Sequence, residues 1–331
     1  MLRLNAIACA LALSAFPAGA GPPPAGPRDI PADVAATEAA SAITAEQLAL
    51  QRDRYERVTI PVTIQGQGPY RFLVDTGAQV TVLSHRVVEE LQIEPTGRAT
   101  LVAMGSQRSV DTFDLDGLEF ANRVFSGLMA PLLHRQDIGA DGILGLDSLQ
   151  DLRVLIDFEE GRMDVADAET LGGNSGYEIV VRARRQLGQM IITDAKIDGI
   201  RTAVIIDTGA QNTVANLALR KRLRGRDTGH QSYSTDVLGA ELAANVFIAK
   251  RLAIGRMEMN NVPLGYAESP VFASLGLGDT PAIILGMRNM RVFRRVAIDF
   301  SSQRVLFDLP RGAQSNDIGR QIFNPTRLGS T

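Results

Sequence analysis

The chain has 331 residues, of which 45% are hydrophobic and 21% are charged, and both fractions are ordinary for a globular protein with one or two substantial cores. The formal net charge is −3, so no excess of basic residues points to nucleic acid, and no nucleic-acid partner is predicted.

Residues 1–20 have the pattern of a secretory signal peptide. Arg3 supplies a positive charge, residues 4–16 are nearly all apolar, and residues 18–20 form a small-x-small cleavage site. This apolar stretch is shorter than the roughly 20 residues that span a bilayer, so no stable membrane insertion is expected once the signal is removed. The single cysteine, Cys9, lies inside the signal, and the mature chain would therefore contain neither a disulfide nor a thiol nucleophile.

The segment 21–55 is predicted to be a linker. Its first residues, 21–27, are rich in Pro and Gly and are typical of a flexible tether. Residues 44–54 could form a short helix, with Thr44 and Gln47 as a capping box. The sequence leaves open whether this segment is a removable pro-segment or a packed arm. At the other end, residues 311–331 are predicted to be a polar tail.

A seven-residue phrase occurs twice, as LVDTGAQ at residues 73–79 and as IIDTGAQ at residues 205–211. In each copy an aspartate, Asp75 or Asp207, directly follows an apolar strand-like run. A carboxylate at the end of a buried strand is unfavourable unless its charge is held or its proton is shared. Two such acids in one chain suggest that they meet.

The surroundings of the phrase also repeat, which predicts two homologous, mostly β lobes. Nine residues separate Asp75 from Ser84, and nine separate Asp207 from Asn216. Each half is rich in alternating strand patterns, such as residues 58–64 and 190–197. The predicted lobes cover residues 56–170 and 177–310, and a Gly-rich linker joins them at 171–176.

Further repeated features are an apolar pair followed by glycine (143–145 and 284–286) and a strand that ends in an aspartate (153–158 and 295–300). The strand-end aspartates Asp157 and Asp299 are interpreted as structural because each precedes a turn. Ser84 and Asn216 are predicted to cap the first helix of their lobe.

These landmarks resemble those of the retropepsin-like aspartic proteases. The two D-T-G-A phrases are similar to that family's active-site loop, and the Ile-Leu-Gly elements are similar to the strand that passes beside it. Both half-sites lie in one chain, and with the signal peptide the sequence is most similar to bacterial exported members. The resemblance implies two acid-protease lobes with the active site in a cleft between them, a monomer with a pseudo-twofold axis, and the periplasm as the location, with full secretion as the alternative.

The resemblance also implies an aspartic endopeptidase that acts on a protein or peptide substrate and needs no cofactor. Asp75 and Asp207 would activate one water molecule as a pair that shares a proton. The remaining loop residues would support the pair: Thr76, Gly77, Ala78, Thr208, Gly209 and Ala210. The two threonines would lock the loops together, and the glycines would leave backbone N–H groups free to point at the carboxylates.

Two hairpin tips are candidates for flaps that close over the substrate, with Gly105 and Gly239 at the turns and Met104 and Leu238 as apolar contacts. Ordinary hairpin turns remain the alternative. No metal site is predicted: the three histidines lack metal-ligand spacing, and residues 137–148 echo a calcium loop but have serine at the closing position.

Three other interpretations compete with the protease. Each D-T-G could be a turn that its aspartate caps, although two copies in matching lobes argue against this. A phosphotransferase of the actin and hexokinase type also has two related domains with D-x-G loops, but it needs several long helices and a supply of ATP. An exported peptide-binding protein with the protease fold but no turnover is the third possibility.

Overall fold

The computed structural model describes residues 5–7 and 59–310, except 187 and 225–226. The predictions for the linker at 21–55 and the tail at 311–331 lie outside these residues. Residues 5–7 form a short strand, β1, inside the segment predicted to be a signal peptide, and that prediction stays untested.

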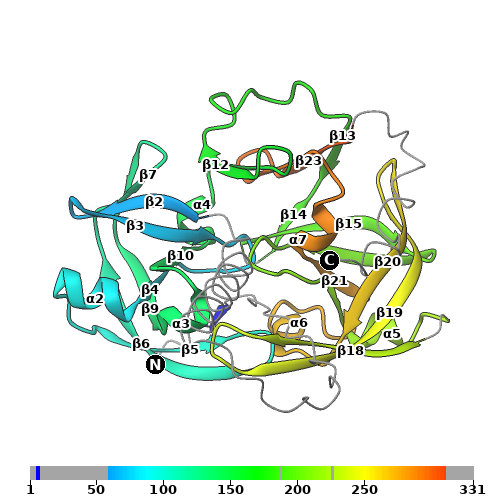
Figure 1. Ribbon diagram of the computed structural model, residues 1–331, viewed down its shortest axis with the longest axis horizontal. Helices are drawn as coiled ribbons and strands as arrows, with labels where there is room; N and C mark the ends of the chain where they lie inside the picture. Colours follow the sequence, from blue (N-terminus) through cyan, green and yellow to red (C-terminus); the bar gives the residue numbers. More distant parts are fainter. Residues whose placement is uncertain (1–4, 8–58, 187, 225–226, 311–331) are drawn as a thin grey trace, which may run out of the picture. The chain divides into compact units, whose positions relative to one another are not determined.

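The first lobe contains a ten-stranded sheet of order β1-β5-β6-β9-β4-β10-β3-β2-β7-β8 (Figure 1). Its strands are β1 (Asn5–Ile7), β2 (Thr59–Ile64), β3 (Gln67–Val74), β4 (Val82–Ser84), β5 (Gly97–Val102), β6 (Gln107–Leu115), β7 (Leu118–Phe120), β8 (Arg123–Phe125), β9 (Leu128–Leu133) and β10 (Gly142–Leu144). Its helices are α2 (His85–Leu91), α3 (Arg135–Ile138) and α4 (Leu146–Leu149).

The hairpin of β2 and β3 shows how the sequence sets up the first active-site loop. Gln65 and Gly66 form the turn, with φ of 51° and 74°, and β3 begins at the next residue. The end of β3, residues 72–74, is buried because β2 and β10 flank it on both edges. Asp75 follows directly and is therefore delivered into the interior.

The second lobe contains an eight-stranded sheet of order β14-β15-β16-β21-β17-β20-β19-β18, and an added pairing of β15 with β19 closes this sheet on itself. Its strands are β14 (Arg184–Gln186), β15 (Gln189–Ile197), β16 (Ile200–Ile206), β17 (Val214–Ala215), β18 (Asp227–Thr235), β19 (Glu241–Ile254), β20 (Met257–Tyr266) and β21 (Ala282–Leu285). Its helices are α5 (Leu217–Arg220), α6 (Pro270–Ser274) and α7 (Met287–Met290).

The two predicted helix caps differ. The side chain of Asn216 accepts a hydrogen bond from the backbone N–H of Leu219 at 2.9 Å, as an N-cap does, and its amide group donates to the carbonyls of Leu277 and Thr280. Ser84 occupies the N-cap position of α2, but its side chain makes no capping bond. Ser84 was therefore predicted at the correct position, but the expected capping hydrogen bond of its side chain is not formed.

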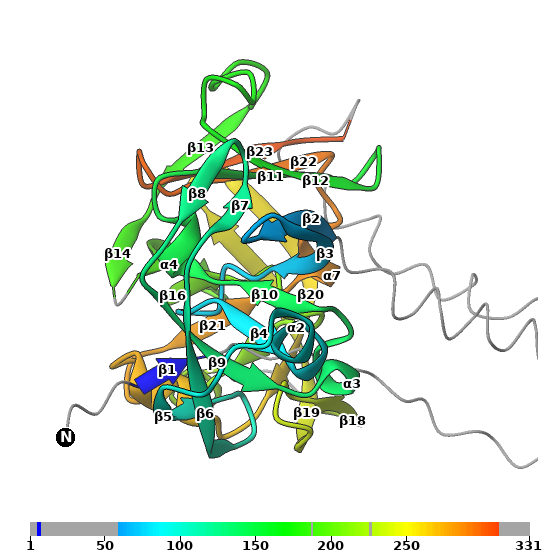
Figure 2. The same ribbon diagram turned by 90° about the vertical axis from the view of Figure 1, so that its left-hand side faces the viewer.

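A third sheet joins the lobes and was not predicted. Its order is β12-β11-β22-β23-β13, formed by β11 (Arg153–Asp157), β12 (Arg162–Ala166), β13 (Ile179–Arg182), β22 (Arg295–Asp299) and β23 (Arg304–Asp308). Figure 2 shows these strands together at its top. The strands predicted to close each half, β11 and β22, pair with one another antiparallel across the lobes.

This joining sheet contains a buried ion pair where β11 begins and β22 ends. Arg153 donates to Asp299 at 2.6 Å, and their side chains are 1% and 3% exposed. Burial raises the pKa of Asp299, but the Arg153 guanidinium and the donors of Ser301 and Ser302 outweigh it and lower that pKa to about 2. Asp157 accepts the backbone N–H groups of the turn that follows it, and both strand-end aspartates thus serve structure, as predicted.

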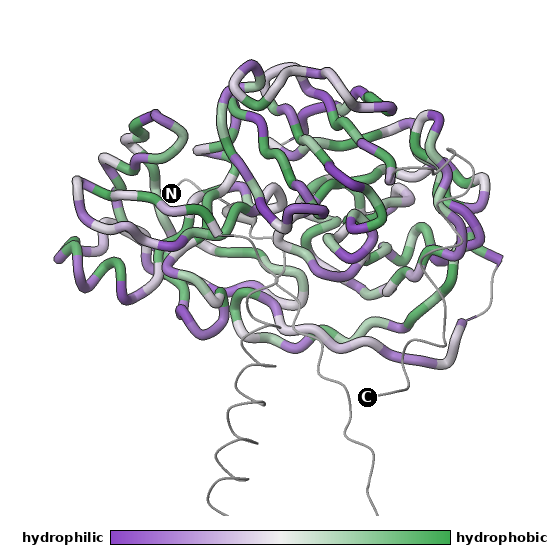
Figure 3. The backbone as a smooth tube through the Cα atoms, turned by 45° about the horizontal axis from the view of Figure 1, so that its top comes forward, coloured by the Kyte–Doolittle hydropathy of each residue, from purple (hydrophilic) through white to green (hydrophobic). Residues whose placement is uncertain are grey.

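Hydrophilic and hydrophobic residues alternate along many of the strands (Figure 3), as expected for sheets with one face in a core. Within the part of the chain that the structure describes, no helix has the length and apolar character needed to cross a membrane.

Candidate active site

Asp75 and Asp207 occupy equivalent places at the ends of β3 and β16. The backbone N–H of Asp75 donates to the carbonyl of Leu144 at 3.1 Å, and that of Asp207 donates to the carbonyl of Leu285 at the same distance. These two bonds continue the parallel pairings of β3 with β10 and of β16 with β21. Each aspartate is therefore fixed by two strands rather than held on a free loop.

The backbone holds one oxygen of each carboxyl group. Oδ1 of Asp75 accepts the N–H groups of Gly77 at 2.8 Å and Ala78 at 3.1 Å. The second lobe repeats this arrangement, in which Oδ1 of Asp207 accepts from Gly209 at 2.8 Å and Ala210 at 3.0 Å. The prediction that the loop amides point at the carboxylates matches this geometry.

The two loops face each other closely. A Cβ atom added to Gly209 would lie 2.3 Å from Oδ2 of Asp75, which is far inside van der Waals contact. Glycine is required at position 209 because the carboxyl group of the opposite lobe occupies that space.

Burial and proximity both act on the proton affinity of the site. Asp75 is 1% exposed and Asp207 is 0% exposed. The pKa of Asp75 is raised well above its ordinary value, first by burial and then by the charge of Asp207, while the N–H donors of Gly77 and Ala78 oppose the rise. The pair therefore favours a state in which a proton is retained.

The threonines lock the loops together reciprocally. Oγ1 of Thr76 donates to the carbonyl of Ile206 at 2.8 Å, and Oγ1 of Thr208 donates to the carbonyl of Val74 at 2.6 Å. Each hydroxyl also accepts the backbone N–H of the other threonine, at 3.2 Å and 3.0 Å. Four hydrogen bonds thus cross from lobe to lobe directly beneath the aspartates.

The Ile-Leu-Gly elements pass against the loops, as the resemblance implied. A Cβ on Gly145 would lie 2.3 Å from the backbone carbon of Val80, and one on Gly286 would lie 2.5 Å from the carbonyl oxygen of Asn212. Backbone bonds follow, from Leu146 N–H to the Ala78 carbonyl at 2.9 Å and from Met287 N–H to the Ala210 carbonyl at 2.8 Å.

Sequence reasoning missed several supporting residues. Gln189 of the second lobe is buried and donates to the carbonyl of Gly77 at 2.6 Å. Thr81 and Thr213 each follow their aspartate by six residues, and each hydroxyl accepts the N–H of the nearby glycine element, at 3.3 Å and 3.1 Å. The equal spacing of the two threonines was an available signal, whereas nothing in the sequence around Gln189 indicated its contact.

The proposed flap residues lie at two hairpin tips that meet. Gly105 lies between β5 and β6, and its N–H donates to Asp236 at the tip of β18 and β19. Gly239 lies in the second tip with φ of 79°, a conformation that favours glycine. Met104 and Leu238, the candidate apolar contacts of these tips, are buried, at 1% and 3% exposure.

Two histidines come together away from the aspartates. The rings of His85 and His134 stack with centroids 4.6 Å apart. Among the described residues, no group of three or more His, Cys, Asp or Glu side chains is arranged to hold a metal ion.

Comparison with known proteins finds two family models that match separate parts of the chain. Residues 60–151 match the family model described as "gag-polyprotein putative aspartyl protease", and residues 193–288 match the model described as "Aspartyl protease". No curated protein matches. Among solved structures, the chain is similar to a retropepsin-like aspartic protease from Rickettsia conorii, with 18% identity over 40% of this chain and 90% of that one and a TM-score of 0.28. The two family models include Asp75 and Asp207, one in each match.

Proposed function

The chain belongs to the retropepsin-like aspartic proteases, with two lobes in one polypeptide, and from this premise we propose that it is an endopeptidase whose catalytic residues are Asp75 and Asp207. The observation that carries the proposal is the mirrored pair of loops. Each lobe contributes one buried carboxyl group, each group is held by two backbone N–H donors, and the two groups face each other.

The proposed mechanism uses the shared proton of this pair. The ionised carboxyl group takes a proton from a water molecule, and the water oxygen forms a bond to the scissile carbonyl carbon. The protonated carboxyl group gives its proton to the carbonyl oxygen, which yields a neutral tetrahedral intermediate. When the C–N bond breaks, one hydroxyl proton of the intermediate returns to the pair and the pair protonates the leaving amine. The raised pKa of Asp75 supports this scheme because it keeps a proton on the pair as the pH rises.

We propose no cofactor for this reaction and a protein or peptide as the substrate. The predicted signal peptide places the proposed activity outside the cytoplasm, in the periplasm or secreted. Because both half-sites lie in one chain, the specific activity should not fall on dilution, unlike that of an enzyme whose site forms between two chains.

The test is cleavage of a peptide library by the purified chain, with and without a statine-type inhibitor that mimics the tetrahedral intermediate. Asp75→Asn and Asp207→Asn should each lower kcat/KM by at least about 1,000-fold, and the double substitution should cost little more, because the two groups act as a unit. Asp151→Asn, at an exposed aspartate, is the matched control and should leave kcat/KM unchanged. A single active-site variant that retains half of the parent activity would refute the shared-water mechanism.

A further inference from the structure

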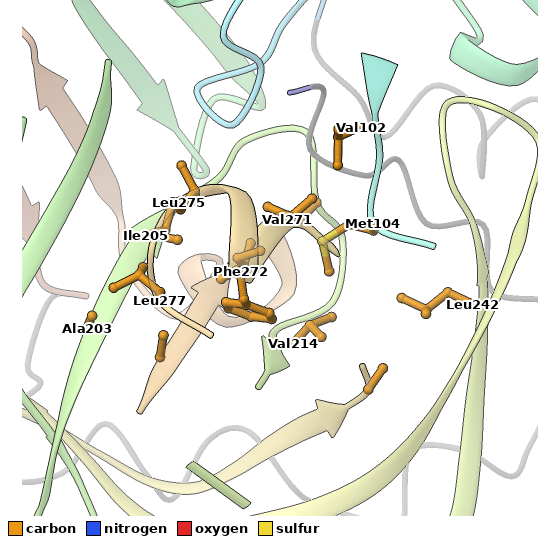
Figure 4. Close-up of a cluster of buried hydrophobic side chains, with 14 of the residues drawn as sticks. Val102, Met104, Ala203, Ile205, Val214, Leu242, Val271, Phe272, Leu275 and Leu277 are labelled. Carbon is orange, nitrogen blue, oxygen red and sulfur yellow. The ribbon is translucent and has the colours of Figure 1, made fainter. Parts of the chain in front are cut away.

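The tip of each lobe's hairpin is packed into the other lobe. Met104, in the turn between β5 and β6 of the first lobe, belongs to a buried apolar cluster made almost entirely of second-lobe residues. Figure 4 shows its sulfur turned toward Val271 and Phe272. The hydroxyl of Ser269 is 3.6 Å from that sulfur. Met104 therefore fills an apolar space that the second lobe builds.

The hairpin tip of the second lobe packs into the first lobe in the same way. Val237 and Leu238, in the turn between β18 and β19, belong to a buried cluster otherwise made of first-lobe residues. In Figure 1 the tip of this hairpin reaches the first lobe beside α3. A Cβ atom added to Gly239 would lie 3.5 Å from the carboxylate oxygens of Asp137 in α3, which places the tip in contact with that helix.

Both clusters extend to the active-site loops. Ala210 shares the cluster of Met104, and Ala78 shares the cluster of Leu238. Each of these alanines donates its N–H to an aspartate of the pair. The tip side chains thus belong to the same apolar clusters as the alanines that hold the two carboxyl groups. These carboxyl groups are themselves 1% and 0% exposed.

One side chain fastens the tips together. Asp236 is 1% exposed, and its Oδ1 accepts the N–H groups of Leu238 and Ala240, both at 2.9 Å, which shapes its own tip. Its Oδ2 accepts from the opposite lobe, from the N–H of Gly105 at 3.1 Å and the hydroxyl of Ser106 at 2.7 Å. One oxygen therefore serves the turn, and the other serves the contact between lobes.

We propose that the two tips are self-occluding plugs, in which Met104 and Leu238 occupy the apolar spaces that substrate side chains take up beside the aspartates, and Asp236 latches the plugs in place. This inference rests on the proposed function. It assigns a competitor for the substrate within the chain itself: an extended peptide enters only when the Asp236 bonds to Gly105 and Ser106 break. A peptide with a long, flexible apolar side chain on each side of the scissile bond fills the spaces that Met104 and Leu238 vacate.

The latch can be weakened without disturbing the turn that carries it. In Asp236→Asn the side-chain oxygen still accepts from Leu238 and Ala240, but the amide nitrogen now faces the N–H of Gly105 and can no longer accept from it. Ser106→Ala removes one latch bond from the other side. Ser234→Ala is the matched control because the hydroxyl of Ser234 donates within its own hairpin, to the carbonyl of Leu242.

The measurement is the calorimetric Kd of a non-cleavable, reduced-amide octapeptide with Met and Leu at the central positions, together with kcat/KM for its cleavable counterpart. The apparent Kd rises as the fraction of open molecules falls, so weakening the latch should lower it. We expect Asp236→Asn to tighten peptide binding about 10-fold and to raise kcat/KM by a similar factor. Ser106→Ala should produce a smaller change in the same direction, and Ser234→Ala none.

Peptide binding that is unchanged or weaker in both latch variants would overturn the proposal, because the tips would then be clamps on the substrate or plain structural contacts. The binding arm also separates the two proposals. If the parent chain hydrolyses no peptide, the proposed function fails, while the Kd values of the parent and latch variants still decide whether the tips occlude the site.

Discussion

In the first lobe, the loop that carries Asp75 is supported by a charged side chain: the backbone N–H and the hydroxyl of Thr81 donate to Asp147 in α4, at 2.9 Å and 2.7 Å. In the second lobe, the hydroxyl of the corresponding Thr213 donates to the neutral amide oxygen of Asn289 in α7, at 2.7 Å. Closer to the aspartates, this difference vanishes. The hydrogen bonds from the backbone N–H groups to the carboxyl groups have nearly the same lengths in the two lobes, and so do the threonine hydrogen bonds between the loops.

The comparison separates two kinds of contact. Contacts that touch the carboxyl groups or cross between the loops are the same in both lobes, as the proposed mechanism requires of a pair that shares one proton. Contacts one layer further out only have to keep the Ile-Leu-Gly elements beside the loops, and either a carboxylate or an amide can do this. Substitutions in the inner layer should therefore have large and symmetric effects, and exchanges in the outer layer should have small ones.

The largest effect on stability is expected from the threonines. Thr76→Val and Thr208→Val each remove a buried hydroxyl that both donates and accepts across the lobes, leaving a buried N–H and a buried carbonyl without partners. Each substitution should lower the free energy of unfolding by about 2–5 kcal/mol, in equal measure for the two lobes.

Urea denaturation of both single variants and of the double variant would measure this symmetry. The double variant should lose less than the sum of the singles, because the four bonds form one network. Thr202→Val provides the control, since its buried hydroxyl donates locally, to the carbonyl of Ile200. A loss confined to one lobe would contradict the symmetry of the inner layer.

The inner layer was predictable from the sequence because it repeats. Two copies of a phrase that is identical over residues 75–79 and 207–211 imply two copies of the same local bonds. The resemblance to a known family supplied the role of the threonines. The sheet between the lobes was not predictable in this way. The apolar runs at 153–158 and 295–300 indicate strands, but a periodic pattern does not say which strand lies alongside, and each run could equally have paired within its own lobe.

The packing of each hairpin tip into the other lobe could not be predicted from the sequence, for a related reason. Met104 and Leu238 stand next to glycines between extended stretches, which is enough to predict a hairpin tip. Their burial depends on spaces formed mostly by residues more than 80 positions away, and on a carboxylate, Asp236, that resembles any other turn aspartate in the sequence. Contacts between distant segments that depend on shape have no local signature.

A second prediction concerns how ionisation of the buried aspartates changes the free energy of unfolding. The pKa of Asp75 is higher in the folded chain than in the unfolded one, mainly because of burial and then because of Asp207. The unfolded chain therefore releases this proton first, and the stability falls as the pH rises above the unfolded pKa of about 4. Asp75→Asn removes the ionisation while its amide oxygen can still accept from Gly77 and Ala78.

This substitution should raise the free energy of unfolding at pH 7 by about 1–3 kcal/mol and leave it nearly unchanged at pH 3. Urea titrations of the parent and the variant at both pH values would measure the difference. Asp207→Asn should behave alike if the inner layer is symmetric. Equal destabilisation at both pH values would show that the carboxyl group is needed for folding instead.

A third prediction concerns the exchange of Asp147 and Asn289, the outer-layer side chains that differ between the lobes. Asp147 is half-buried, and desolvation raises its pKa while the donors of Thr81 oppose the rise. Asp147→Asn should change the free energy of unfolding by less than about 1 kcal/mol at pH 7, because an amide can replace the carboxylate, its oxygen accepting the N–H of Thr81 and its nitrogen donating to the hydroxyl.

The reverse exchange is less favourable. Asn289→Asp places a new carboxylate in a site that is 2% exposed and offers it the hydroxyl of Thr213, so we expect a loss of about 1–3 kcal/mol at pH 7 that shrinks as the pH falls. Chemical denaturation at pH 4 and pH 7 would test both variants. Equal losses in the two lobes would contradict the view that their outer layers differ in kind.

The smallest expected effect concerns the alanines of the two loops, at which the two lobes are alike. Ala78 and Ala210 are 1% and 4% exposed, and each gives its carboxyl group only a backbone N–H. A hydroxyl at this position can add a second donor to the ionised form, which stabilises that form and lowers its pKa. The active state has one proton on the pair, so the bell-shaped profile of kcat/KM should move to lower pH.

One neutral hydrogen bond is worth on the order of 1 kcal/mol, which corresponds to less than one pKa unit. We therefore expect Ala78→Ser with Ala210→Ser to shift both limbs of the profile downward by less than about one pH unit, without loss of activity. Each single substitution should give about half of the shift if the lobes contribute equally, and unequal shifts would reveal which carboxyl group gives up its proton more readily. Ala99→Ser, at a buried alanine of β5, controls for the effect of burying a hydroxyl elsewhere. Limbs that stay in place or move upward in a well-folded double variant would mean that the backbone N–H donors alone set the proton affinity of the pair.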